Sequence, residues 1–450
     1  MSSEAFRFPY HDVLSAFVPA DGRQNDTAAI QSAIDECSVA GGGRVVLPSG
    51  QFLCGFLELK SNVDLHLSPG AVLLSSPNIS DYETEHDTRG LLFLLYAIDA
   101  ENISITGGGT IDGNGRAFIE KGPAHIHLKK GPRPFTVGIV GCRNVTMKDI
   151  KSVDAAHWTV TLVGCDDALI HGIRIVNDML MPNSDGIDLE RCRNVRISDC
   201  HIEAGDDCIV FKTNRRWDGY GPCENVTVTG CTMVSNSFAV NMGCEVQEPI
   251  RNIVVDSCVI RSSHRGVGIH LSEASDVENI VFSNLIIETR YRHPDWWGAA
   301  EPIYIVALPW TENDTVGTVR HIRFTNILCR GENGVFVLGE DESTIDDVVF
   351  DNVRVELDKW TDEPGGRHDI RPCAGDDNGR ESGVYDHPSA GFYLQNARNI
   401  TIRNCGVFWG DNRPDYYRYA LESHRVTNLV LDHFTGEAAH PERDSPTVID

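Results

Sequence analysis

Apolar and polar residues alternate along most of this chain in short runs, and many of the runs begin at an asparagine. Typical copies are Asn194-Val195-Arg196-Ile197, Asn225-Val226-Thr227-Val228 and Asn252-Ile253-Val254-Val255. Alternation with a period of two is typical of β-strands. Asn225 follows Asn194 by 31 residues and Asn252 follows Asn225 by 27 residues, a repeat length that indicates a solenoid. We therefore predict an all-β chain folded as a single-stranded, right-handed parallel β-helix.

The cysteines follow the same repeat. The chain has 14 of them, and Cys200, Cys231, Cys258 and Cys405 each come six residues after a repeat asparagine. Other copies have isoleucine, valine or leucine at this position. A position that accepts both aliphatic residues and cysteine faces the interior, so we expect buried thiols rather than disulfides.

The N-terminal region has a different periodicity. Within about residues 20–40, apolar side chains recur with the spacing of an α-helix, at Ala29, Ile30, Ala33, Ile34 and Cys37. An open solenoid end needs a cover, so we predict a capping helix here. The whole of 1–450 is predicted to form a single domain, with loops protruding at about 114–134, 290–312 and 358–390, which are rich in glycine, proline and aspartate.

Charge and targeting signals narrow the range of partners. The net charge of −26 argues against nucleic acid and against anionic membranes. The start of the chain, 1–7, lacks the features of a signal peptide, and no stretch is apolar over about 18 residues. We expect a cytoplasmic protein with no membrane partner, and the sequence leaves its oligomeric state open.

Four aspartates form two clusters, each at the start of a short apolar run. Asp185 and Asp188 flank Gly186-Ile187, and Asp206 and Asp207 precede Cys208-Ile209. The two runs fall in consecutive repeats, so Asp185 and Asp207 are expected on neighbouring coils. Converging carboxylates suit glycoside hydrolysis, in which one acid is protonated and another carboxylate activates water. An Asx turn remains an equal explanation for Asp188.

These motifs resemble glycoside hydrolase family 28, the pectin-degrading polygalacturonase family. The resemblance rests on Asn183-Ser184-Asp185-Gly186 and on Gly205-Asp206-Asp207-Cys208-Ile209, and it extends over nearly the whole chain. It implies a parallel β-helix that hydrolyses an α-glycosidic bond with inversion and without a cofactor. It also implies that Asp206 is the general acid and that Asp185 and Asp207 activate water.

Two other signatures of the family are altered. Phe238 stands where the family usually has a histidine, and Gly268-Ile269-His270 stands where it usually has Arg-Ile-Lys. The family's arginine and lysine hold a galacturonate carboxylate, which glycine and neutral histidine cannot do. The resemblance therefore predicts the reaction better than the substrate, which need not be galacturonan.

Other residues near these motifs are candidates for sugar binding. Polar and cationic candidates could replace the missing contacts, and aromatic ones could stack on a sugar ring, although for each a structural role is as good an explanation. The candidates are Asn183, Asp188, Lys212, Trp158, His157, His264, Arg265, His270, Trp296 and Trp297. His125 and His127 lack further ligands at a defined spacing, so no metal is expected.

We expect exo action on short oligosaccharides, because polymers do not enter cells and the long loops could block one end of a cleft. A uronate lyase or epimerase on the same solenoid is an alternative, although such chemistry wants a cation and a basic residue. A non-catalytic carbohydrate-binding β-helix is a second alternative, in which Phe238 and Gly268 mark a decayed site.

Overall fold

The computed structural model describes residues 21–311, 313–371 and 383–450, which divide into two compact units. The first unit comprises 21–187 and 192–201, and the second comprises 188–191 and 202–450. The expectation of a single domain stays a prediction. The segment 1–7, from which we predict that a signal peptide is absent, lies outside the described residues. No helix within the described ranges is long and apolar enough to cross a membrane.

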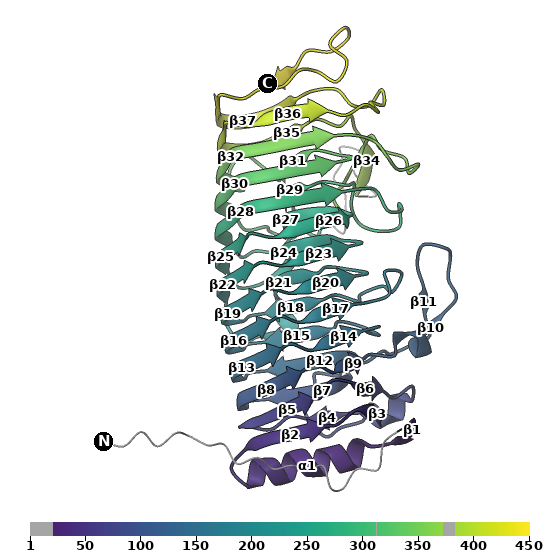
Figure 1. Ribbon diagram of the computed structural model, residues 1–450. Helices are drawn as coiled ribbons and strands as arrows, with labels where there is room; N and C mark the ends of the chain where they lie inside the picture. The colour runs from purple at the N-terminus through teal and green to yellow at the C-terminus, as the bar shows by residue number, and fades with distance from the viewer. Residues whose placement is uncertain (1–20, 312, 372–382) are drawn as a thin grey trace. The chain divides into compact units, whose positions relative to one another are not determined.

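The first unit consists of one helix and short strands, drawn in purple to teal in Figure 1. Its α-helix is α1 (Thr27–Val39), and two 3₁₀ turns are η2 (Ile79–Tyr82) and η3 (Gly115–Phe118). Its strands are β1 (Asp21–Asn25), β2 (Gly43–Leu47), β3 (Gly50–Cys54), β4 (Leu57–Glu58), β5 (Val63–Leu67), β6 (Ala71–Ser75), β7 (Phe93–Ile98), β8 (Glu101–Gly107), β9 (Thr110–Asp112), β10 (Ile119–Glu120), β11 (Leu128–Lys129), β12 (Phe135–Val140), β13 (Arg143–Lys148), β14 (Lys151–Val153), β15 (Val160–Val163), β16 (Asp166–His171), β17 (Arg174–Val176) and β19 (Arg193–Ser198).

Three strands make one coil in this unit, and equivalent strands of successive coils pair in parallel. β12 pairs with β15, β13 with β16 and β14 with β17. Along β13 and β16, Val145 lies opposite Ala168 and Met147 lies opposite Ile170, and all four side chains are buried. The alternation read from the sequence therefore corresponds to an interior face and an exterior face of each strand.

The predicted cap is the helix α1. Ile30, Ala33, Ile34 and Cys37 form its buried face, which packs against β2, β4 and β5. Figure 1 shows α1 lying across the first strands of the unit. The helix is shorter than the predicted 20–40, because β1 precedes it and Gly41 and Gly42 follow it with positive φ.

The second unit repeats the same coil with longer strands. β18 (Ile187–Glu190) and β20 (His201–Ala204) each begin with one residue of the first unit. The other elements are β21 (Ile209–Thr213), η4 (Arg215–Trp217), β22 (Cys223–Thr229), β23 (Thr232–Ser235), β24 (Phe238–Val246), β25 (Ile250–Asp256), β26 (Val259–Ser263), β27 (Arg265–Leu271), β28 (Val277–Thr289), β29 (Ile303–Ala307), β30 (Val319–Gly331), β31 (Val335–Gly339), β32 (Ile345–Leu357), β33 (Arg367–Asp369), β34 (Val384–Asp386), β35 (Phe392–Arg403), β36 (Gly406–Trp409), β37 (Leu421–Asp432) and β38 (Thr447–Ile449).

The repeat asparagines lie inside strands β22, β25 and β28, where the backbone locally leaves the extended conformation. Asn225, Asn252 and Asn279 have φ near +60°, a left-handed conformation that asparagine tolerates better than most residues. Their side chains also bond to one another, since Asn252 Nδ2 donates to Asn225 Oδ1 at 3.0 Å and Asn279 Nδ2 donates to Asn252 Oδ1 at 3.2 Å. The four register cysteines are buried thiols, as predicted.

All three predicted loops contain strands. Within 290–312, residues Ile303–Ala307 form β29, which pairs with β27, so the prediction of a continuous loop was wrong there. From the sequence, this apolar run was not recognised as a strand because the residues around it are rich in glycine and tryptophan. Within 358–390, β33 and β34 form an antiparallel hairpin, and residues 372–382 lie outside the described residues. In 114–134, β10 and β11 form a second antiparallel hairpin.

Candidate active site

Asp206 and Asp207 lie in the bend between β20 and β21, at the mouth of a parallel strand. The pairing of Ile209 with Val240 places the start of β24 beside them. Asp207 is 6% exposed. Its Oδ1 accepts from the Phe238 backbone N at 3.0 Å, and its Oδ2 accepts from Asn241 Nδ2 at 3.2 Å. Two N–H donors are the arrangement that suits an ionised carboxylate.

Asp206 has a contrasting environment. Burial, followed by the charge of Asp207, raises its pKa to about 7, although Lys212 and a hydrogen bond from Ser237 act in the opposite direction. Carboxylate oxygens of Asp206 and Asp207 lie within 4.8 Å of one another. Beside this second carboxyl group, Asp206 thus keeps its proton up to near neutral pH, as a general acid requires.

Asp188, Glu190 and Lys212 form a buried charged group beside this pair. Lys212 Nζ lies 3.4 Å from Asp188 Oδ1, and Glu190 accepts from the Asn214 backbone N at 2.9 Å. Burial raises the pKa of Asp188 well above its ordinary value and that of Glu190 to about 7, while Lys212 opposes both shifts. Asp188 is fully buried in this structure, and its role in substrate binding stays a prediction.

The first motif, Asn183-Ser184-Asp185, lies in the first unit and is held firmly there. Asn183 adopts a left-handed φ of 57°, and its Oδ1 accepts from Arg133 at 3.1 Å. Ser184 Oγ donates to the Met181 carbonyl at 2.9 Å. The Asp185 carbonyl accepts from the Thr159 backbone N at 2.9 Å, and Asp185 is buried. That Asp185 acts together with Asp207 stays a prediction.

His157 and Trp158 lie one coil before Asp185, as the register predicts. The His157 ring stacks on Phe135 with centroids 4.2 Å apart, and Trp158 meets Phe135 edge-on at 5.3 Å. Both side chains are partly exposed. Trp158 therefore remains a candidate sugar platform.

His127, considered as a metal ligand, has its Nε2 3.1 Å from Asp178.

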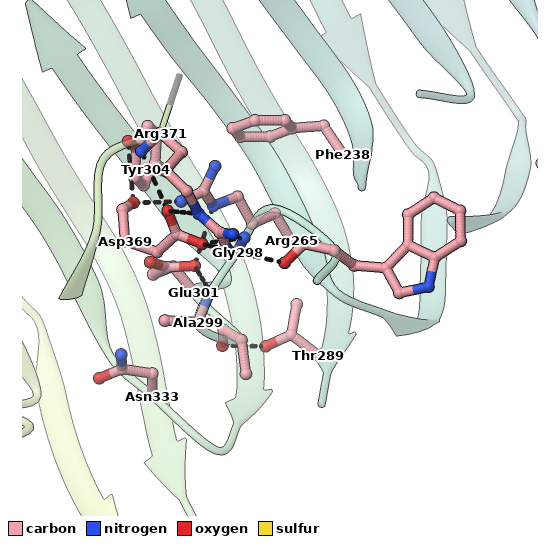
Figure 2. Close-up of polar contacts among 12 residues, drawn as sticks. Phe238, Arg265, Thr289, Gly298, Ala299, Glu301, Tyr304, Asn333, Asp369 and Arg371 are labelled. Carbon is pink, nitrogen blue, oxygen red and sulfur yellow. Dashed lines mark hydrogen bonds and ion pairs between the residues drawn. The ribbon is translucent and has the colours of Figure 1, made fainter. Parts of the chain in front are cut away.

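Arg265 is a structural residue and not a substrate contact. It is fully buried, and its Nε lies 3.0 Å from Glu301 Oε2. Its guanidinium also donates to the Asp369 carbonyl and stacks 3.9 Å from the centre of the Tyr304 ring. Figure 2 shows this group, and the centroid of the Phe238 ring also lies 4.9 Å from the guanidinium carbon. The sequence prediction that Arg265 binds sugar was therefore wrong, because its charge is used inside the protein.

Three other candidates are withdrawn from solvent. His264 is fully buried, and burial lowers its pKa to about 3. His270 is also buried, with a pKa of about 3 for the same reason. Trp296 is only 6% exposed. In this structure these three side chains are closed off from solvent, and that they contact a sugar stays a prediction, whereas Trp297 is 45% exposed.

Several residues of this region were not recognised from the sequence. Asn241 and Glu190 contribute directly to the surroundings of the aspartates, and Glu301 and Asp369 fix Arg265. Asn241 and Glu190 stand close to named motif residues in the repeat, so the repeat could have revealed them. Asp369 is 104 residues from Arg265 in sequence, and no local pattern relates the two.

Comparisons with known proteins agree with this fold. The model for glycosyl hydrolases family 28 matches residues 37–364. A probable polygalacturonase of Vitis vinifera is 31% identical over 240 residues, covering 49% of this chain and 48% of that protein. An exopolygalacturonase of Cochliobolus carbonum is 29% identical over 204 residues, covering 43% and 44%. The chain thus spans about half the length of the curated relatives it matches.

Solved structures with a similar fold cover more of the chain. An exopolygalacturonase from Thermotoga maritima has a TM-score of 0.67 at 22% identity, covering 96% of this chain and 93% of that one. A family 28 exopolygalacturonase of Yersinia enterocolitica has a TM-score of 0.71 at 18% identity, covering 94% and 78%. The fold prediction of a parallel β-helix is confirmed. Since the family match extends over well more than half of the chain, the protein belongs to family 28 of the glycosyl hydrolases.

Proposed function

We propose that this protein is a glycosidase that cleaves an α-glycosidic bond of a pectin-type oligosaccharide with inversion. One observation carries the proposal: Asp206 has a pKa of about 7 while its neighbour Asp207 is held by two N–H donors. One group can give a proton and the other can accept one, which is the division of labour that glycoside hydrolysis needs.

In the proposed reaction, Asp206 protonates the glycosidic oxygen as the bond to the anomeric carbon breaks. A water molecule attacks that carbon from the opposite face, and Asp207 together with Asp185 takes its proton. Asp206 and Asp207 approach within 4.8 Å, closer than the roughly 6.5–9.5 Å usual for inverting pairs. This distance alone does not favour inversion. We base inversion on the family membership, and we propose that the attacking water is bound beside the aspartate pair rather than between its two carboxyl groups.

We propose a neutral sugar at the cleaved position. Lys212 faces Asp188, Arg265 faces Glu301, and His270, with a pKa of about 3, is uncharged at neutral pH. These cationic side chains of β21 and β27 are therefore balanced by carboxylates or are neutral. A galacturonate carboxylate would need a cation that is not already used in this way.

We propose exo action, which is supported by the way one face of the second unit is filled. Tyr304, Phe336 and Tyr393, on successive strands, are buried with Phe238 in one apolar cluster. Ile370, which follows β33, is buried in the same cluster. Protein side chains thus fill the face on the C-terminal side of β27, which supports our proposal that the substrate cleft is blocked at one end. Short oligosaccharides also suit the cytoplasmic location that we propose.

Hydrolysis of aryl α-glycosides and pectic oligosaccharides by the wild type and by Asp206→Asn tests the function. We expect turnover of at least one neutral-sugar substrate, with single residues released from one end. The Asn variant should lose about 10²–10⁴-fold in kcat, the usual contribution of a general acid. If the wild type shows no turnover and Asp206→Asn keeps the wild-type affinity for the sugar, the chain is a binding protein. Unsaturated products whose formation depends on calcium would instead indicate a lyase.

A further inference from the structure

Two arginines, Arg290 and Arg292, lie in the same stack of turns as the aspartate pair, in the segment between β28 and β29. Successive turns of this stack are joined by backbone hydrogen bonds, from Asn236 N to the Ala204 carbonyl at 3.2 Å, from His264 N to the Ser235 carbonyl at 2.9 Å and from Arg290 N to the Ser263 carbonyl at 2.8 Å. Ala204 ends β20 and leads into the bend of Asp206. Arg290 therefore lies three turns further along the second unit than Asp206.

The Arg292 side chain reaches back along the stack towards the aspartates. Its guanidinium donates to the Ser262 carbonyl, and Ser262 belongs to β26, which leads into the turn of His264. That turn is two strand spacings, roughly 10 Å, from the turn of Asp206. The guanidinium is therefore within reach of a substrate that extends from the aspartate pair into the neighbouring sugar position.

Arg292 has no counter-charge of its own. Among the described residues, neither Arg290 nor Arg292 forms an ion pair, whereas Arg261 on the same coil pairs with Glu203. Arg292 is partly buried, and its Nε is buried without a hydrogen-bond partner. Burial, followed by the charge of Arg290, lowers the pKa of Arg292 to about 10, so the side chain stays charged at neutral pH. A cation withdrawn from water without a partner is costly, which indicates that an anion from outside the chain pairs with it.

The segment that carries Arg292 also offers a surface for a sugar ring. Trp297 of this segment is 45% exposed. Arg371 Nη2 fixes the backbone between the two, since it donates to the Pro294 carbonyl at 2.9 Å and to the Trp296 carbonyl at 3.1 Å. An exposed tryptophan and an unpaired cation in one fixed segment suit an acidic sugar, whose ring can stack and whose carboxylate can pair.

We propose that Arg292, with Arg290 beside it, binds the carboxylate of an acidic sugar in the substrate. The planar guanidinium can hold a carboxylate through two parallel hydrogen bonds. The inference rests on the proposed hydrolase function, in which the sugar at the cleaved position is neutral, so the acidic sugar is the one joined to it. The substrate class is an oligosaccharide in which a neutral sugar is α-linked to a uronate. The cation for its carboxylate comes from the segment before β29 and not from Gly268 or His270 of β27.

Binding to the full chain carrying Asp206→Asn, followed by calorimetry, tests the site without turnover. The ligands are pectic oligosaccharides that end in a neutral sugar, used in native form and after reduction of their carboxyl groups to alcohols. We expect the native form to bind roughly 10–100-fold more tightly, the range for hydrogen bonds to a charged group. Adding Arg292→Gln should remove this difference by weakening only the native form, and Arg292→Lys should restore part of it.

Arg261→Gln is the matched control, because Arg261 precedes Ser262, is exposed and already pairs with Glu203. It should leave the affinity for both ligand forms unchanged. Arg292→Gln should keep the wild-type Tm, since it breaks no ion pair. Three results would overturn the proposal: equal affinity for the native and reduced forms, binding of neither form, or an Arg292→Gln variant that weakens both forms equally.

Hydrolysis of the same two ligands by the wild type separates this inference from the proposed function. Carboxylate-dependent binding without any hydrolysis would refute the glycosidase and leave the anion site standing. Hydrolysis of the native and reduced forms with equal kcat/KM would leave the glycosidase standing and overturn the anion site. Release of the uronate itself from the end of the oligosaccharide would overturn the placement of the acidic sugar next to a neutral one.

Discussion

At the scale of single residues, the proposed chemistry depends on two adjacent aspartates that the chain places in unlike surroundings. Asp207 is fixed by the Phe238 backbone and by Asn241, so its orientation does not depend on substrate. Burial and the charge of Asp207 raise the pKa of Asp206 to about 7. Adjacent positions on a strand mouth point in different directions, which is how neighbours in sequence acquire different roles.

The pKa of Asp206 predicts the alkaline limb of the pH–rate profile. Because burial and Asp207 raise that pKa to about 7, the proton needed for leaving-group protonation is present below pH 7 and lost above it. We expect kcat to fall about tenfold per pH unit above the limb. Steady-state rates between pH 4 and 9 measure it. A rate that stays flat to pH 9 would exclude Asp206 as the acid.

Glu190 predicts a pH dependence of stability. Its pKa is raised to about 7, chiefly by burial, so the protonated form is favoured in the fold. The stability from this shift is complete below the unfolded pKa of about 4.3 and is lost as pH rises through 7. Glu190→Gln should flatten the loss of unfolding free energy between pH 4.5 and 7.5 in denaturant titrations. An identical slope in wild type and variant would refute the assignment.

The sequence identified Asp185, Asp206 and Asp207 because they form contiguous motifs in register with the repeat. It did not reveal that Arg265, His264 and His270 are buried, since a repeat predicts the position of a residue along a strand but not what packs over it. Arg265 is covered by Asp369, over 100 residues away. Burial by a distant segment depends on tertiary packing that local pattern does not encode.

At the scale of elements, the covering segment is held to the coil by buried charges. Arg265 of β27 pairs with Glu301, which precedes β29, and donates to Asp369 at the end of β33. Arg371 adds contacts to the Asp369 carboxylate and to the Trp296 carbonyl (Figure 2). Burial would raise the pKa of Asp369, but hydrogen bonding to Arg371 and the charge of Arg265 lower it overall. Such groups fix geometry more than they add net stability.

Removing one partner should be costly. Arg265→Met leaves Glu301 buried without its cation, so we expect a loss of about 3–5 kcal/mol in the free energy of unfolding. The control is Arg261→Met, whose partner Glu203 lies at the surface, and which should cost about 1 kcal/mol or less. Chemical denaturation measures both. Equal losses in the two variants would contradict a structural role for the buried pair.

Most strands of the coil could be predicted from alternation and from the asparagine positions, whereas β29 could not. Ile303 to Ala307 is apolar throughout because both faces are covered, and a uniform apolar run gives no period. Its flanks have the composition of a loop. The strand was therefore hidden by the same covering segments that bury Arg265.

At the scale of the whole molecule, the repeat and the two motifs were sufficient to predict the family, and the family match confirms it. The substrate could be predicted less well from the sequence, because its recognition depends on side chains whose charges are paired with other groups inside the protein. The net charge of −26 fits a neutral sugar better than a polyanion, since like charges slow association. Hydrolysis of the preferred oligosaccharide should therefore depend weakly on ionic strength, while a polyuronate would show a steep dependence.

The central claim is single displacement by the aspartate cluster, and the anomer formed first tests it most directly. Proton NMR followed from the first seconds of hydrolysis of an α-linked substrate distinguishes the two possible products before mutarotation mixes them. We predict that the β-anomer appears first and the α-anomer only later, at the rate of mutarotation. Initial release of the α-anomer would show retention, as the short distance between Asp206 and Asp207 would suggest by itself, and would contradict the mechanism.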